Sequence, residues 1–113
     1  EAFMDNAKQR SNINALDWSK MLEDAGVGEL MVTSIDREGR MKGFDNELIS
    51  RIVSNAKIPV IASGGAGKAE DISSLQLKTK CEAAAIASLF HYQKMTVSEA
   101  KDFLLSKSIL VRK

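Results

Sequence analysis

Residues that cross-link a chain or ligate metals are scarce in this sequence. Its 113 residues include one cysteine, Cys81, and one histidine, His91. A single cysteine excludes an internal disulfide, and no Cys/His cluster has the spacing of a metal site. We therefore predict neither a metal nor a cofactor, and we expect Cys81 to be an inert small residue at the start of a strand.

An excess of charge and a long hydrophobic run are also lacking. Sixteen Lys and Arg against fifteen Asp and Glu give a net charge of +1, so no broad basic surface is available for nucleic acid. No apolar run approaches the roughly 20 residues that span a bilayer, and residues 1–5 have no signal-peptide pattern. These absences predict a cytoplasmic protein that binds neither nucleic acid nor a membrane. Because the first residue is glutamate rather than methionine, further residues can precede it.

What is present is an alternation of helical and extended patterns. Apolar residues at steps of three and four predict helices over 13–25, 45–53 and 69–75, and another after Thr96. Short apolar runs predict buried strands over 29–35, 58–63 and 82–89, although the alanines of the last run also favour helix. Residues 1–11 lack periodicity and are expected to form a loop. Trp18 is expected to face the core, and Asp45 and Thr96 have the positions of N-caps. The alternation indicates an α/β fold with a parallel sheet covered by helices.

A glycine cluster, Gly64-Gly65-Ala66-Gly67, joins the second strand to the next helix. Glycine lets backbone N–H groups approach an anion closely, and a helix start adds further donors, so the cluster suits phosphate. The alternative is a tight turn that needs glycine only for its dihedral angles. Lys68 is poorly placed against the helix dipole, which favours a role in balancing a phosphate.

Three loops are expected at one edge of such a sheet, because ligand-binding loops follow the C-terminal ends of parallel strands. They are residues 36–43, the glycine cluster and the loop that begins at Ser88. Asp36 and Arg37 are either a solvated pair or substrate contacts. His91 lies several residues past the strand end and is expected to be structural.

Four motifs occur in a fixed order along the chain. They are Gly28-Glu29-Leu30 running into Thr33-Ser34-Ile35-Asp36-Arg37-Glu38-Gly39, then Gly43-Phe44-Asp45, then Pro59-Val60-Ile61-Ala62-Ser63-Gly64-Gly65-Ala66-Gly67-Lys68, and last Ala87-Ser88-Leu89-Phe90-His91. Together they resemble the cyclase subunit of imidazole glycerol phosphate synthase, a TIM (β/α)8 barrel of histidine biosynthesis. The resemblance covers nearly the whole chain but only the second half of that barrel. It implies that residues 1–113 form the C-terminal half, from the helix after strand five to the helix after strand eight.

The resemblance implies a lyase that works with a glutaminase partner. In that family, ammonia from the partner is added to a bis-phosphorylated, nucleotide-like substrate, and the products are imidazole glycerol phosphate and an aminoimidazole carboxamide ribotide. Two aspartates at the ends of the first and fifth strands act as acid and base. Neither position lies in this sequence, since Asp5 falls in the loop after the fifth strand. The chain alone is therefore expected to be inactive.

The same resemblance implies three kinds of binding residue in this chain. Phosphate contacts are expected at Gly39, Gly64, Gly65, Ala87 and Ser88. The substrate pocket is expected to include Thr33, Ser34 and Asp36, and Glu29 is expected in a ring of charges around the ammonia entrance, at the opposite end of the barrel.

Several departures from the family pattern leave alternatives open. Glu38 replaces an aspartate, and Arg10-Ser11-Asn12, Arg40-Met41-Lys42 and Thr79-Lys80-Cys81-Glu82 replace the usual stretches. One alternative is a divergent paralogue in surface-polysaccharide synthesis. Another is a non-catalytic half-barrel that forms a homodimer, because three strands leave sheet edges and an apolar inner face to be covered. A third is the related isomerase of the same pathway, although the glycine motif resembles the cyclase more.

Overall fold

A computed structural model describes residues 3–4, 9–10, 13–92 and 94–111. Its centre is a parallel sheet in the order β3 (Leu30–Thr33), β4 (Val60–Ser63), β5 (Ala83–Ala85). The helices are α1 (Ala15–Asp24), α2 (Asn46–Asn55), α3 (Ala69–Thr79), the short α4 (Ser88–His91) and α5 (Val97–Ser106). The predicted α/β class, with parallel strands alternating with helices, is confirmed.

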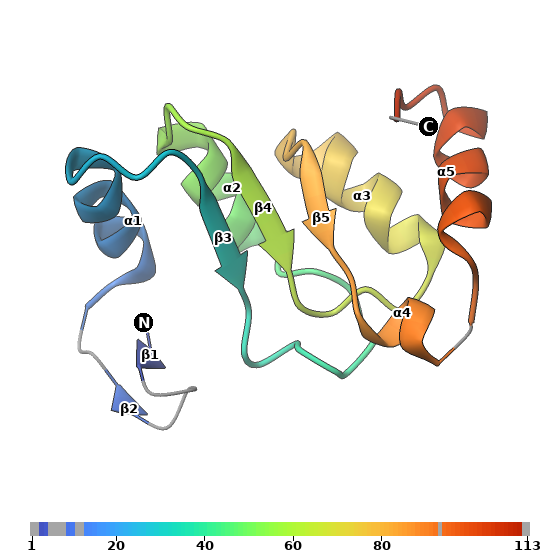
Figure 1. The fold of residues 1–113 in the computed structure, drawn as a ribbon, viewed down its shortest axis with the longest axis horizontal. Helices are drawn as coiled ribbons and strands as arrows, with labels where there is room; N and C mark the ends of the chain where they lie inside the picture. The colour runs from blue at the N-terminus through green and yellow to red at the C-terminus, as the bar shows by residue number, and fades with distance from the viewer. Residues whose placement is uncertain (1–2, 5–8, 11–12, 93, 112–113) are drawn as a thin grey trace.

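The helices form one layer in the order α1, α2, α3, α5, in which each contacts the next. Figure 1 shows α2 and α3 behind the sheet and all three strands pointing toward the same lower edge. Side chains alternate between the faces of a strand, and Leu30, Val60 and Ala62 are buried on the helix side. Met31, on the other face of β3, is 61% exposed. That second face of the sheet is open in the part of the chain that the structure describes.

The core lies between the sheet and the helix layer. The apolar stripe predicted on α2 supplies its centre, since Ile49 is 2% and Ile52 1% exposed, and Leu75 of α3 packs into the same cluster. Full burial of such a side chain contributes about 1.5–3 kcal/mol. The core therefore fixes how α2 and α3 sit behind the strands.

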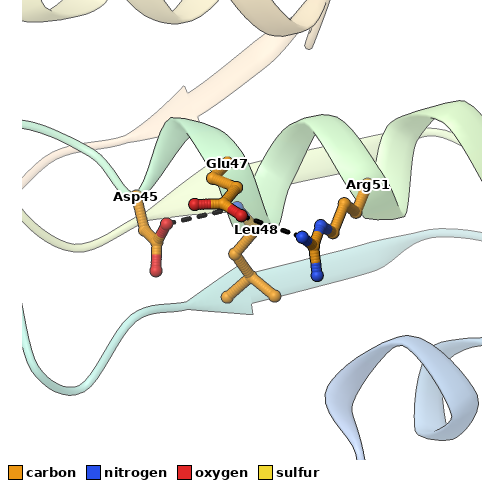
Figure 2. Close-up of polar contacts among 4 residues, drawn as sticks. All are labelled: Asp45, Glu47, Leu48 and Arg51. Carbon is orange, nitrogen blue, oxygen red and sulfur yellow. Dashed lines mark hydrogen bonds and ion pairs between the residues drawn. The ribbon is translucent and has the colours of Figure 1, made fainter.

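Side-chain caps at Asp45 and Thr96 fix where α2 and α5 begin. Figure 2 shows the Asp45 carboxylate accepting a hydrogen bond from the Leu48 amide, with Oδ1 and N 3.2 Å apart. In the same turn Glu47 pairs with Arg51 at 2.9 Å on the exposed face of α2. At α5, the Thr96 hydroxyl accepts from the Glu99 amide at 3.1 Å. Both predicted N-caps are confirmed.

Three predictions about the elements were wrong. The strand expected over 82–89 ends at Ala85, and Ser88 begins α4, because Ala87 has already turned to φ −111° and ψ −64°. Trp18 is 40% exposed, whereas Leu16 and Leu22 of the same helix pack against the core.

The third error concerns the N-terminal region. Part of the expected loop forms two short antiparallel strands, β1 (Phe3–Met4) and β2 (Gln9–Arg10). Asp5, assigned above to the loop after a fifth strand, lies outside the described residues, as do Ser11 and Asn12. Over the described ranges, none of the helices is long and apolar enough to cross a membrane.

Candidate phosphate-binding site

The loops that follow β3, β4 and β5 leave the sheet at one edge, as Figure 1 shows. The ladder between β3 and β4 continues one step beyond the strands, where the Ser34 amide donates to the Ser63 carbonyl at 3.1 Å. The Ser34 carbonyl then accepts from the amides of Arg37 and Glu38, at 3.1 and 2.9 Å. This turn brings the β3–α2 loop back over the glycine cluster.

The glycine cluster packs directly against that loop. Gly64 has φ +95° and Gly65 φ +118°, and both are buried. A Cβ on Gly64 would lie 2.8 Å from the Ser34 carbonyl oxygen, and one on Gly65 would overlap the carbonyl of Gly43. The glycines are thus required for their dihedral angles, as one interpretation of the sequence held, and also for a close backbone contact that the sequence did not reveal.

Two further contacts join the loops. The Gly43 amide donates to the Gly65 carbonyl at 2.7 Å. A Cβ on Gly67 would overlap the Met41 carbonyl, and Met41 itself has φ +55°. The two loops therefore form one packed unit at the end of the sheet.

Several backbone amides at this edge form no hydrogen bond within the described part of the chain. They belong to Gly64, Gly65 and Ala66 in the glycine cluster and to Ala87 and Ser88 at the start of α4. Backbone N–H groups without a partner bind anions where they converge. Gly39, with φ +76°, lies at the exposed tip of its turn, where no other atom comes within 4 Å of an added Cβ.

The predicted pocket residues lie in different places. Thr33 is exposed on the open face of the sheet, in one row with Ser63 and Ala85. Ser34 is 8% exposed and its backbone anchors the turn, while Asp36 is exposed in the loop. Ser63 was not singled out from the sequence. The signal that could have found it is its position, because Ser63 is the last residue of its strand and pairs with Thr33, the last residue of β3.

Glu29 is exposed and directly precedes β3, so it lies at the opposite end of the strand from the loops. This is the end at which an ammonia entrance is expected. Its role as part of that entrance stays a prediction.

Charged side chains surround the loops. Arg37, Arg40, Lys42 and Lys68 are exposed there. The carboxylate of Glu38 approaches to 3.1 Å from the position of a Cβ on Gly64, so the residue that departs from the family pattern lies against the cluster. His91 and Tyr92 are exposed and stack edge to face, with ring centroids 5.2 Å apart. Within the described ranges, no group of three or more His, Cys, Asp or Glu residues could hold a metal ion.

Comparison with known proteins finds relatives of this chain in histidine biosynthesis. A family model described as histidine biosynthesis protein matches residues 1–96. The chain is 42% identical over 112 residues to the imidazole glycerol phosphate synthase subunit HisF of Nitrosopumilus maritimus (strain SCM1), covering 99% of this chain and 42% of that protein. It is 41% identical over 107 residues to the same subunit of Chlorobium phaeobacteroides (strain BS1), covering 95% of this chain and 43% of the relative.

The chain thus spans about two fifths of the length of these curated relatives. The family model, in contrast, covers most of the chain, including β3, β4, β5 and all three loops at their ends. The chain therefore belongs to the histidine biosynthesis protein family.

Proposed function

We propose that the intact protein is the cyclase subunit of imidazole glycerol phosphate synthase, and that this chain supplies one of its phosphate sites. The observation that carries the proposal is the set of amides of Gly64, Gly65 and Ala66, which have no hydrogen-bond partner among the described residues and follow the end of β4. The C-terminal edge of the strands is where barrels of this kind bind phosphate. The similarity to HisF subunits supports the choice of reaction.

In this proposal each site residue keeps the role that the resemblance gave it. Gly39, Gly64, Gly65, Ala87 and Ser88 contact phosphate. Thr33, Ser34 and Asp36 line the pocket, and Glu29 flanks the ammonia entrance. The acid and base lie outside residues 1–113, which form the C-terminal half of the barrel and are inactive alone. The intact enzyme works in the cytoplasm with a glutaminase subunit.

A charge placed at Ser88 tests the site. Replacing the half-buried Ser88 by Asp puts a carboxylate where the phosphate is expected, and repulsion should weaken binding of a bis-phosphorylated substrate analogue at least tenfold. Isothermal titration calorimetry on the full-length gene product measures this. A Gly65→Val variant is less informative, because it also breaks the contact with Gly43.

Ser98→Asp is the matched control, because it adds the same charge to the first turn of α5 at an exposed position. It should leave the affinity for the analogue unchanged. Equal affinity of wild type and the Ser88→Asp variant would remove Ser88 from the phosphate site.

A second candidate function is that of a non-catalytic half-barrel that pairs with a second copy. The open face of the sheet favours it, because Met31, Ile61 and Ala83 form one register row there and Met31 is 61% exposed. A paralogue acting in surface-polysaccharide synthesis is the other alternative. Glu38 has one methylene more than the aspartate that it replaces, and its carboxylate lies beside Gly64, which favours an altered substrate pocket.

A further inference from the structure

A carboxylate of this chain binds two backbone amides just before α3 begins. Asp71, in the first turn of α3, accepts hydrogen bonds through Oδ2 from the amides of Gly67 at 2.8 Å and Lys68 at 3.1 Å. Lys68 is the N-cap of α3 and Gly67 precedes it, so the Asp71 carboxylate occupies two amides just before the helix begins. An anion at this edge must therefore use other amides, such as those of Gly64, Gly65 and Ala66, which have no hydrogen-bond partner among the described residues.

The same carboxylate also reaches the neighbouring loop. Asp71 Oδ1 lies 3.3 Å from the position of a Cβ on Gly43. Gly43 in turn donates to the carbonyl of Gly65 at 2.7 Å. One half-buried side chain thus lies against both sides of the contact between the loops, holding Gly67 and Lys68 on one side and packing on Gly43 on the other.

Sequence reasoning assigned no role to Asp71, because its partners, the amides of Gly67 and Lys68, are backbone groups that side-chain patterns do not reveal. The neighbouring acid offers a contrast. Glu70 is exposed in the same turn, and its side chain forms no hydrogen bond or ion pair among the described residues. Two acids in one helical turn therefore have different surroundings, and only one of them touches the loops.

We propose that Asp71 is a positioning residue for the anion site, which holds the β4–α3 loop so that the amides of Gly64, Gly65 and Ala66 remain directed at a phosphate. This inference rests on the proposed function. Asp71 acts through hydrogen bonds and shape rather than through its charge, because a negative charge beside a phosphate opposes binding. Preorganised donors bind more tightly than donors that must first be ordered.

Three variants of the full-length gene product separate these effects, with inorganic phosphate as the probe. Asp71→Ala removes the acceptor and should weaken phosphate binding about tenfold. Asp71→Asn keeps an acceptor oxygen and the shape, and should bind phosphate within about threefold of wild type or more tightly. Glu70→Ala removes the same charge from the same turn and should bind as wild type does. Phosphorus NMR titration gives the three affinities.

Amide hydrogen exchange without phosphate provides an independent measurement. In Asp71→Ala, exchange at Gly67 and Lys68 should accelerate at least tenfold, and in Asp71→Asn and Glu70→Ala it should remain slow. Faster exchange in Asp71→Ala with a normal thermal melting profile identifies loop ordering rather than general unfolding. If Asp71→Ala itself does not fold, Asp71→Asn still tests the inference, because phosphate binding more than about threefold weaker than wild type would overturn it.

The outcomes are distinguishable. Tighter phosphate binding by both Asp71 variants would show that the carboxylate merely competes with the anion, and would overturn the inference. Unchanged affinity and exchange in Asp71→Ala would overturn it as well. A wild-type protein that binds no phosphate would overturn the proposed phosphate site, and the exchange rates would then decide whether Asp71 orders the loop.

Discussion

The glycines of this chain are needed for different structural reasons. Gly65 combines φ +118° with a backbone neighbour that a Cβ would overlap, whereas Gly28 has open space around it and no left-handed φ. A positive φ and a close approach both favour glycine, but only one of these two positions has them. The same residue type is thus structurally required at one position and replaceable at the other.

Alanine substitution should separate these two glycines. Gly65→Ala should lower the free energy of unfolding by about 2 kcal/mol or more, because the strained φ costs 1–3 kcal/mol and the Gly43 carbonyl must also move. Gly28→Ala should change it by less than about 1 kcal/mol, with a gain expected from the lower entropy of the unfolded chain. Urea denaturation measures both. A neutral Gly65→Ala would show that the two loops separate at little cost.

At the scale of single elements, α2 combines a strong cap and a weak ion pair within two turns. The Asp45 carboxylate satisfies an amide that has no partner inside the helix, while Glu47 and Arg51 meet with side chains 78% and 67% exposed. Solvent screens the exposed pair, and a cap fulfils an obligatory hydrogen bond. The two acidic residues should therefore differ in their effect on stability.

Their substitution gives a prediction about α2. Asp45→Ala should lower the free energy of unfolding by about 1 kcal/mol, in the range of lost N-caps. Glu47→Gln should lower it by less than about 0.5 kcal/mol. Thermal melting followed by circular dichroism compares them. If Glu47→Gln cost as much as Asp45→Ala, the ion pair would matter more than its exposure allows.

At the scale of the whole molecule, one face of the sheet is open among the described residues. Met31 on β3 and Ala83 on β5 are exposed on this face, and Ile61 between them is half-buried. Exposed apolar surface of this kind favours burial against another polypeptide surface. The helix side of the same sheet is already filled by the core.

A charge on the open face tests self-association. If residues 1–113 pair with a second copy through this face, the wild-type chain should elute as a dimer and Met31→Glu as a monomer, because burying an unpaired carboxylate is costly. Size-exclusion chromatography with light scattering measures the mass. The exposed Leu77→Glu on α3 is the control and should leave the dimer intact. A monomeric wild-type chain would contradict the homodimer.

Much of this fold was predictable because its signals are local. Helix periodicity, the caps at Asp45 and Thr96 and the glycines after β4 depend on residues a few positions apart, so they can be recognised without the structure. The motifs also identified the family that the comparisons then established. The sequence by itself thus determined the α/β class, the edge of the sheet that carries the loops and the family.

Only the tertiary structure decided which residues meet across long separations. The contact of Gly43 with Gly65, the row shared by Thr33 and Ser63, and the position of Asp71 between two loops depend on the alignment of the strands. The exposure of Trp18 depends on the rotation of α1 against the sheet. No local pattern encodes these relations, because each arises from packing between elements that are distant in the chain.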